Sequence, residues 1–155
     1  MTTQPDITFE IGGFADNPTI VALRDEKPQI FTWIQTYYNA TVSPEDPGTI
    51  SLAERALIAQ RAAELIPSPV LDTWYGALLE ERGGVADITL PRIQALLDRV
   101  ALVNENPDHS TKEDVQKLRD AGFSQQDIIA VSQLIAFVHY QARLLAGLRA
   151  LGAAS

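Results

Sequence analysis

The sequence predicts an all-α protein, folded as one compact bundle of about six or seven helices. Segments with apolar residues at spacings of three and four recur along the chain, as on the buried faces of helices. Capping or stop signals bound most of these segments, and none of them alternates apolar and polar residues as a half-buried strand does. With 155 residues and 46% apolar content, the chain can form one domain with a continuous core.

The N-terminal segment differs from the rest of the chain. It combines Gly12 and Gly13 with polar residues and shows no sustained period. We therefore expect residues 1–16 to form a flexible or extended arm. Residues 17–155 are expected to form the single helical domain.

Residues with known capping preferences mark the helix boundaries. Ser51 with Glu54 has the spacing of a capping box, because the serine can accept a hydrogen bond from the third residue of the helix and the glutamate can return one. The first expected helices span residues 18–25, 28–39, 52–66, 69–82 and 90–103. A short helix follows that ends at Gly122 and is capped either by Ser110 with Glu113 or by Thr111 with Asp114. A long last helix begins after Ser124.

The last helix is the most apolar element of the chain. Apolar residues form two adjacent stripes on it, so neighbouring helices or another subunit are expected to enclose it as a long buried C-terminal helix. Polar residues within it argue against a membrane span. One narrow polar line runs along it, formed by Ser132, Ala136, His139 and Arg143, with Gln133 and Tyr140 beside that line.

Composition excludes several classes of function. The net charge of -8 and the lack of a basic, aromatic patch make a nucleic-acid partner unexpected. The chain has no cysteine, which excludes disulfides, thiolate nucleophiles and cysteine-ligated metals, and two histidines are few for a metal site. We expect no metal and no cofactor. The first residues have neither a basic start nor an apolar run, so a cytoplasmic location is expected.

Two parts of the chain are similar to a known family. The core hairpin of the carboxymuconolactone decarboxylase and alkylhydroperoxidase AhpD superfamily resembles residues 51–65 (SLAERALIAQRAAEL) and the helix after them. The closing helix pair of that superfamily resembles residues 118–143, which begin LRDAGFS. The resemblance covers residues 50–149, and residues 23–48 resemble the leader of a branch labelled only as carboxymuconolactone decarboxylase domain proteins. It implies an AhpD-like fold and a homo-oligomer.

The resemblance also implies that the peroxidase site is degenerate. Peroxidase members carry a Glu, then a Cys-x-x-Cys pair, then a His four residues further on. A serine cannot replace the thiol, because its hydroxyl is scarcely ionised and cannot cycle through sulfenic acid and disulfide. The matching positions here are Ala56 for the Glu, Ser68 and Leu71 for the cysteines, and Tyr75 for the His, or Trp74 if the register shifts by one.

A few residues remain as candidates for chemistry. His139 could act as a general acid or base, Arg143 could anchor a carboxylate or enolate, and Tyr75 could donate a hydrogen bond. The alternative for His139 and Arg143 is a structural histidine in an interface and an arginine paired to an acidic neighbour. A pocket beside these residues would be lined by Trp74, Gln133 and Tyr140, although aromatic residues on amphipathic helices are more often core.

Ser68 has a competing structural explanation. It precedes Pro69 at the start of a helix, where serine is a preferred N-cap, and no histidine lies near it in sequence. We therefore favour a cap over a nucleophile.

Two functions from different classes follow. The first is an oligomeric accessory or partner-binding protein without thiol-peroxidase activity, acting beside an active cysteine-bearing paralogue. The second is a cofactor-free lyase or isomerase that transfers a proton on a small carboxylate-bearing substrate, with His139 and Arg143 in the roles given above.

Overall fold

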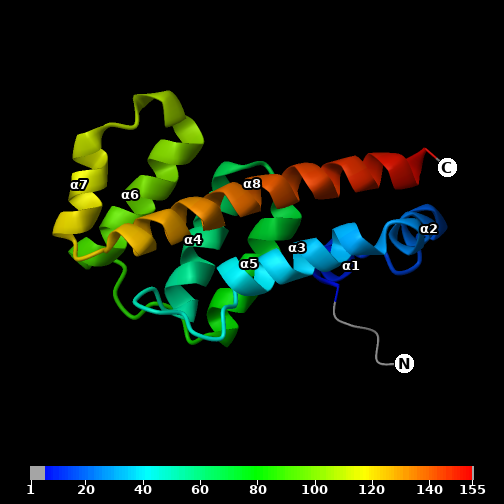
Figure 1. Cartoon of the computed structure of the whole chain (residues 1–155), viewed down its shortest axis with the longest axis horizontal. Helices are drawn as coiled ribbons and strands as arrows, with labels where there is room; N and C mark the ends of the chain where they lie inside the picture. The colour runs from blue at the N-terminus through cyan, green and yellow to red at the C-terminus, as the bar shows by residue number, and fades with distance from the viewer. Residues whose placement is uncertain (1–5, 155) are drawn as a thin grey trace.

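The computed structural model describes residues 6–154, and the regular secondary structure of this part of the chain is all helix, joined by turns and loops (Figure 1). The elements are α1 (Ile7–Gly12), α2 (Pro18–Glu26), α3 (Pro28–Thr41), α4 (Leu52–Leu65), α5 (Pro69–Glu81), α6 (Pro91–Glu105), a short 3-10 helix η1 (Pro107–His109), α7 (Lys112–Asp120) and α8 (Gln125–Ala153). The all-α prediction is confirmed. Each predicted helix after residue 17 is present, with its ends within about two residues of the prediction.

The predicted capping residues begin the helices as expected. Ser51 and Glu54 form the reciprocal capping box at the start of α4. Of the two alternatives for α7, the structure has Thr111 with Asp114. Proline takes the first position of α2, α3, α5 and α6, where its missing N–H is not needed.

The prediction of an extended N-terminal arm is wrong for residues 7–12, which form α1. The Asp6 carboxylate accepts hydrogen bonds from the backbone N–H groups of Thr8 and Phe9, and so caps this helix. The side chains of Ile7, Phe9 and Ile11 are buried in the core. Burial against the rest of the domain therefore stabilises a helix that is too short to form alone. Residues 1–5 lie outside the described part of the chain.

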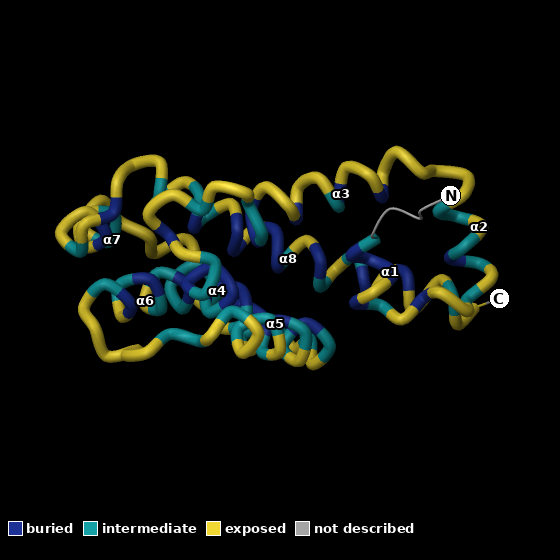
Figure 2. Tube along the Cα trace, turned by 90° about the horizontal axis from the view of Figure 1, so that it is seen from below, coloured by how far each residue is buried: buried dark blue, intermediate teal, exposed yellow. Residues whose placement is uncertain are grey.

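The helices form layers around α8. Figure 2 shows α8 between α3 on one side and the α4–α5 hairpin on the other, with α6 and α7 near its start and α1 and α2 near its end. Side chains from both sides close the core, and the fully buried residues include Ile58, Leu71, Leu134, Ile135 and Leu145. The hairpin and α8 therefore form one packed unit, on which any site near α5 depends.

Helix α8 is long, as predicted, but it is only partly buried. One face carries the buried residues Val131, Leu134, Ile135, Phe137, Val138, Gln141, Leu145 and Leu148. The opposite stripe, Ile129, Gln133, Ala136 and Tyr140, is exposed. By length and composition alone α8 could cross a membrane, but a helix with one face packed in a core passes the same test.

Two arginines hold the connection between α3 and α4. Arg55, which is 7% exposed, donates hydrogen bonds to the backbone carbonyls of Thr41 (2.8 Å), Pro47 (3.1 Å) and Ile50 (3.2 Å). Arg82 of α5 donates to the carbonyls of Val42 (3.0 Å) and Leu52 (2.8 Å) and to the hydroxyl of Ser43. These bonds satisfy carbonyl groups that the proline-rich segment cannot pair with its own N–H groups.

Candidate functional site

Tyr75 lies in the core and not at a surface. Its side chain on α5 is fully buried, and its hydroxyl donates a hydrogen bond to the side-chain carbonyl oxygen of Gln141 on α8. Burial, and after it the neighbouring Tyr38, raises the pKa of Tyr75 well above its ordinary value of 10.0. The hydroxyl therefore stays protonated and is already paired within the protein.

The other three positions of the degenerate peroxidase site are divided between core and surface. Ala56 on α4 and Leu71 on α5 have no exposed surface. Ser68 is partly exposed at the N-cap position of α5, and its backbone carbonyl accepts from the N–H groups of Leu71 and Asp72. Its side chain makes no capping hydrogen bond, so the cap explanation holds for the position of Ser68 but not for its hydroxyl.

Glu54 does more than cap α4. Its Oε2 accepts from the backbone N–H of Ser51 at 2.7 Å, and its Oε1 accepts from Nε of Arg92 at 3.0 Å. Arg92 also lies 4.1 Å above the ring of Phe123. This carboxylate is committed to joining α4 with α6, so it cannot take the role of the missing family glutamate.

His139 and Arg143 meet Ser68 at an open depression of about 300 Å³ between the start of α5 and the outer side of α8. The depression is lined by Ile66, Pro67, Ser68, Pro69, His139, Ala142, Arg143, Ala146 and Arg149. Tyr75 is not among these residues. The structure therefore brings together two of the three predicted catalytic residues and adds Ser68, which sequence distance had separated from His139.

The depression is electropositive in a protein of net charge -8. Within residues 6–154, neither Arg143 nor Arg149 forms an ion pair. The alternative that pairs Arg143 with an acidic neighbour in an interface therefore has no counterpart within the described chain and stays a prediction. The N-terminus of α5 adds the partial positive charge of a helix start.

His139 is neutral near pH 7. Burial, and secondly Arg143, lowers its pKa from the ordinary 6.5. Its Nε2 is buried and has no hydrogen-bond partner among the described residues, so the imidazole is not fixed as a structural histidine usually is. The arrangement can hold an anion and accept a proton at a histidine nitrogen, without a nucleophile beyond the Ser68 hydroxyl.

The three residues predicted to line a pocket with His139 lie apart from its depression. Tyr140 is 43% exposed and belongs to a separate groove of about 380 Å³ between α3 and α8. Gln133 is exposed on α8. Trp74 packs half-buried against the core, with its indole N–H buried and unpaired.

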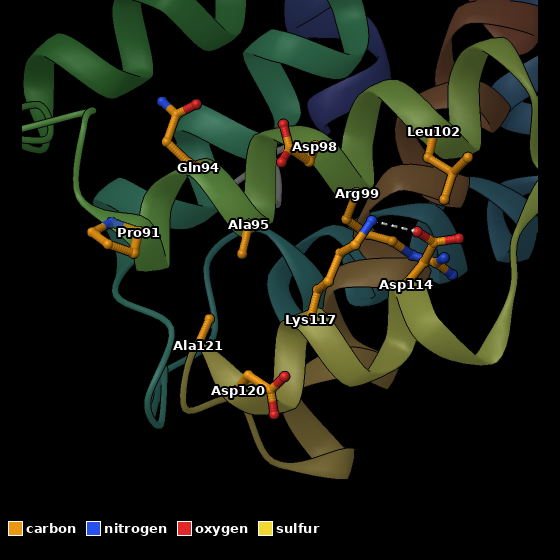
Figure 3. Close-up of a pocket in the computed structure, with 10 residues that line it drawn as sticks. All are labelled: Pro91, Gln94, Ala95, Asp98, Arg99, Leu102, Asp114, Lys117, Asp120 and Ala121. Carbon is orange, nitrogen blue, oxygen red and sulfur yellow. Dashed lines mark hydrogen bonds and ion pairs between the residues drawn. The ribbon is translucent and has the colours of Figure 1, made fainter.

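The largest cavity described, about 660 Å³, lies between α6 and α7 and contains none of the predicted residues (Figure 3). Some of its charged groups have partners within the protein, whereas Nε of Arg99 is buried with no hydrogen-bond partner among residues 6–154. Lys117 pairs with Asp114 at 3.1 Å, as the dashed line in Figure 3 shows, and a terminal nitrogen of Arg99 donates to the hydroxyl of Ser110 at 2.8 Å.

The arrangement of helices is similar to that of a protein of known structure. The chain is similar to the crystal structure of an alkylhydroperoxidase AhpD core, an uncharacterised peroxidase-related protein from Ralstonia eutropha JMP134, with a TM-score of 0.57 over 92% of this chain and 83% of that one. This is the AhpD fold. The sequence identity is 18%, and no protein-family model or curated protein matches the sequence. The AhpD-like fold was predicted correctly, and this chain carries it without any cysteine.

Two residues at the candidate site, Gln141 and Arg149, were not predicted from the sequence. Gln141 is a polar residue in a mostly apolar helix, and a buried glutamine requires a partner. Arg149 follows Ala142 by seven residues and Ala146 by three on α8, so it reaches the same depression although it lies off the line of His139 and Arg143.

Proposed function

We propose that this chain is an AhpD-like protein without thiol-peroxidase activity that acts by binding, as an oligomeric accessory protein in the cytoplasm. The surroundings of the four peroxidase positions support this proposal most strongly. Three of the four positions are packed in the core, among them Tyr75, whose hydroxyl is bonded to Gln141, and Ser68 is partly exposed. The residues that would relay protons to a thiol have become part of the structural interior.

An assay with an organic hydroperoxide and a dithiol reductant tests the first half of this proposal. The purified protein should consume hydroperoxide no faster than buffer. The double variant Ser68→Cys, Leu71→Cys should stay equally inactive, because Ala56 and Tyr75 still supply no acid or base for a new thiol. Turnover by the wild-type protein above the buffer rate would refute the proposal.

The partner half concerns a second protein of the same fold. An accessory subunit would bind a cysteine-bearing AhpD-like protein from the same source. Mixing the two purified proteins should give a complex of defined mass and altered peroxidase rate. Two unchanged elution profiles and an unchanged rate would leave no accessory role of this kind.

A second function has an observation of its own. In the part of the chain that the structure describes, Arg143 and Arg149 form no ion pair, and both open on the same depression as His139 and Ser68. This favours a small carboxylate-bearing ligand, anchored by Arg143, with neutral His139 as the base that removes a proton. Tyr75 contributes only through Gln141, by holding α5 against α8.

The titration of His139 tests this second function. A bound dicarboxylate such as malonate should raise the pKa of His139, because a nearby anion favours the imidazolium form. The Arg143→Gln variant should lose most of that response, whereas Arg61→Gln, at a distant exposed ion pair, should keep it. An unchanged titration in malonate would exclude an anion site here.

A further inference from the structure

One outer surface of the molecule is apolar and uncharged. Helices α3 and α8 lie side by side there, and between them runs the groove of about 380 Å³. We call this surface the aromatic face and define it by Ile30, Trp33, Tyr37, Ala136, Phe137 and Tyr140. Trp33 is 64% exposed, which makes it the most exposed large apolar side chain among residues 6–154.

The aromatic face is rigid beneath its exposed edges. The rings of Tyr37 and Phe137 lie 5.2 Å apart, and those of Phe137 and Tyr140 are stacked at 6.1 Å. Trp33 has no such ring neighbour within the described chain. It stands as a ridge beside a groove whose floor includes the small Ala136. The face thus offers both a projecting side chain and a hollow.

The lack of charge on the aromatic face indicates which partner can bind there. Helix α3 contains no charged residue over its 14 positions, although charged residues make up 21% of the chain and the net charge is -8. Two copies of so acidic a protein repel each other through most surfaces, and least where neither carries a charge. A basic partner would instead be met by carboxylates, and α3 has none. A second copy of this chain therefore fits the face.

The area is that of a dimer interface. With roughly 200 Å² for a large side chain, the exposed fractions of Ile30, Trp33, Tyr37 and Tyr140 leave about 400 Å² of mostly apolar surface. Ile129, further along the exposed stripe of α8, adds about 100 Å². A standard interface takes about 800 Å² from each partner, of which about 60% is apolar. The aromatic face supplies that apolar share, and it is about as large as the largest apolar patch of a typical monomer, a patch that often has a function.

We infer that the aromatic face pairs with the same face of a second copy about a two-fold axis, with the Trp33 side chain of each copy entering the groove beside Ala136 of the other. One surface patch that carries both ridge and groove can match itself in this way. This inference rests on the proposed binding function and identifies its first partner. The groove is thereby filled, and the chain acts as a dimer.

Molar mass in solution tests the pairing. At micromolar concentration the wild-type protein should have twice the 17.0 kDa of one chain. Trp33→Glu should raise the dissociation constant about thirtyfold or more, since it removes a central aromatic anchor and puts a charge in its place. The matched control is Ile88→Glu, at an apolar side chain that is 52% exposed away from the face, and it should leave the mass unchanged. Circular dichroism confirms that both variants are folded.

A cross-link tests the geometry independently of these substitutions. Because the chain has no cysteine, Ala136→Cys places one thiol in the groove near the expected axis. A flexible bis-maleimide should link two copies of this variant, because Trp33 of the other copy lies beside each thiol and keeps the two thiols too far apart for a disulfide. Ala150→Cys, at an exposed position near the end of α8, should not be linked.

Each outcome has a distinct meaning. A monomeric wild-type protein, or a dimer that Trp33→Glu leaves intact while folded, overturns the inference and leaves the lack of peroxidase activity standing. Peroxidase turnover by a protein that dimerises as described refutes the proposed function and not the pairing. Equal cross-linking of the two cysteine variants overturns the assignment of the face.

Discussion

The buried pair of Tyr75 and Gln141 allows a quantitative test of how the degenerate site is built. Tyr75→Phe keeps the ring and removes the hydroxyl. The side-chain carbonyl of Gln141, a residue that is 3% exposed, then has no donor and no water. An unsatisfied buried acceptor costs about 1–3 kcal/mol. For a domain of this size, that corresponds to a fall in Tm of roughly 2–10 °C.

The converse change should cost a similar amount. Gln141→Leu leaves the Tyr75 hydroxyl without an acceptor in the same dry interior. The double variant Tyr75→Phe, Gln141→Leu removes both polar groups together, so it should be less destabilised than the sum of the two single variants by about 1–2 kcal/mol. Urea denaturation followed by circular dichroism gives the free energy of unfolding of all four proteins.

These four proteins are compared with a matched control variant at an exposed position. Gln126→Leu, at an exposed glutamine in the first turn of α8, is the control for Gln141→Leu and should change the free energy of unfolding by less than about 0.5 kcal/mol. If Tyr75→Phe costs as little as that, the hydrogen bond is not formed in the folded protein. If the single losses add fully in the double variant, the two side chains do not interact, and the description of Tyr75 as a structural residue is wrong.

Two other predictions concern a titration and a loop. Burial and Arg143 lower the pKa of His139 below 6.5, so the unfolded chain binds a proton more readily than the folded one, and stability should fall as the pH drops below 6.5 through the folded pKa. The Tm of His139→Gln should fall less than that of the wild-type protein over that pH range, and equal losses would refute the assignment. Arg55→Met should lower the free energy of unfolding by about 3 kcal/mol or more, because three carbonyls lose a charged donor, and it should speed proteolysis within residues 42–50. Arg61→Met, at an exposed ion pair, should lower the free energy of unfolding by less than about 1 kcal/mol and leave proteolysis unchanged.

Local signals explain why most helices were predicted from the sequence. The pairs Ser51 with Glu54 and Ser124 with Asp127 determine where α4 and α8 begin, because their hydrogen bonds involve residues only three apart. Helix α1 was missed because Gly12 and Gly13 indicated a loop. The cap Asp6 and the apolar residues after it are consistent with a helix, but six residues are too few for a helical period to be recognised.

The candidate site could be predicted only in part, because its contacts join distant segments. The hydrogen bond from Tyr75 to Gln141 links residues 66 positions apart, and no local pattern indicates such a pair. The same limit applies to Ser68 and His139, which the packing of α5 on α8 brings to one depression. The polar line of α8 correctly indicated His139 and Arg143 as neighbours, because four residues make about one helical turn.

The two arginines that hold the connection before α4 also fix the position of α3. Arg55 comes from α4 and Arg82 from α5, so the last turn of α3 is tied to the central hairpin by charged hydrogen bonds as well as by apolar contacts. Helix α3 therefore cannot swing away from α8 without breaking them. A molecule that binds across α3 and α8 meets a surface ordered during folding, so little conformational entropy is lost on association and dissociation is correspondingly slow.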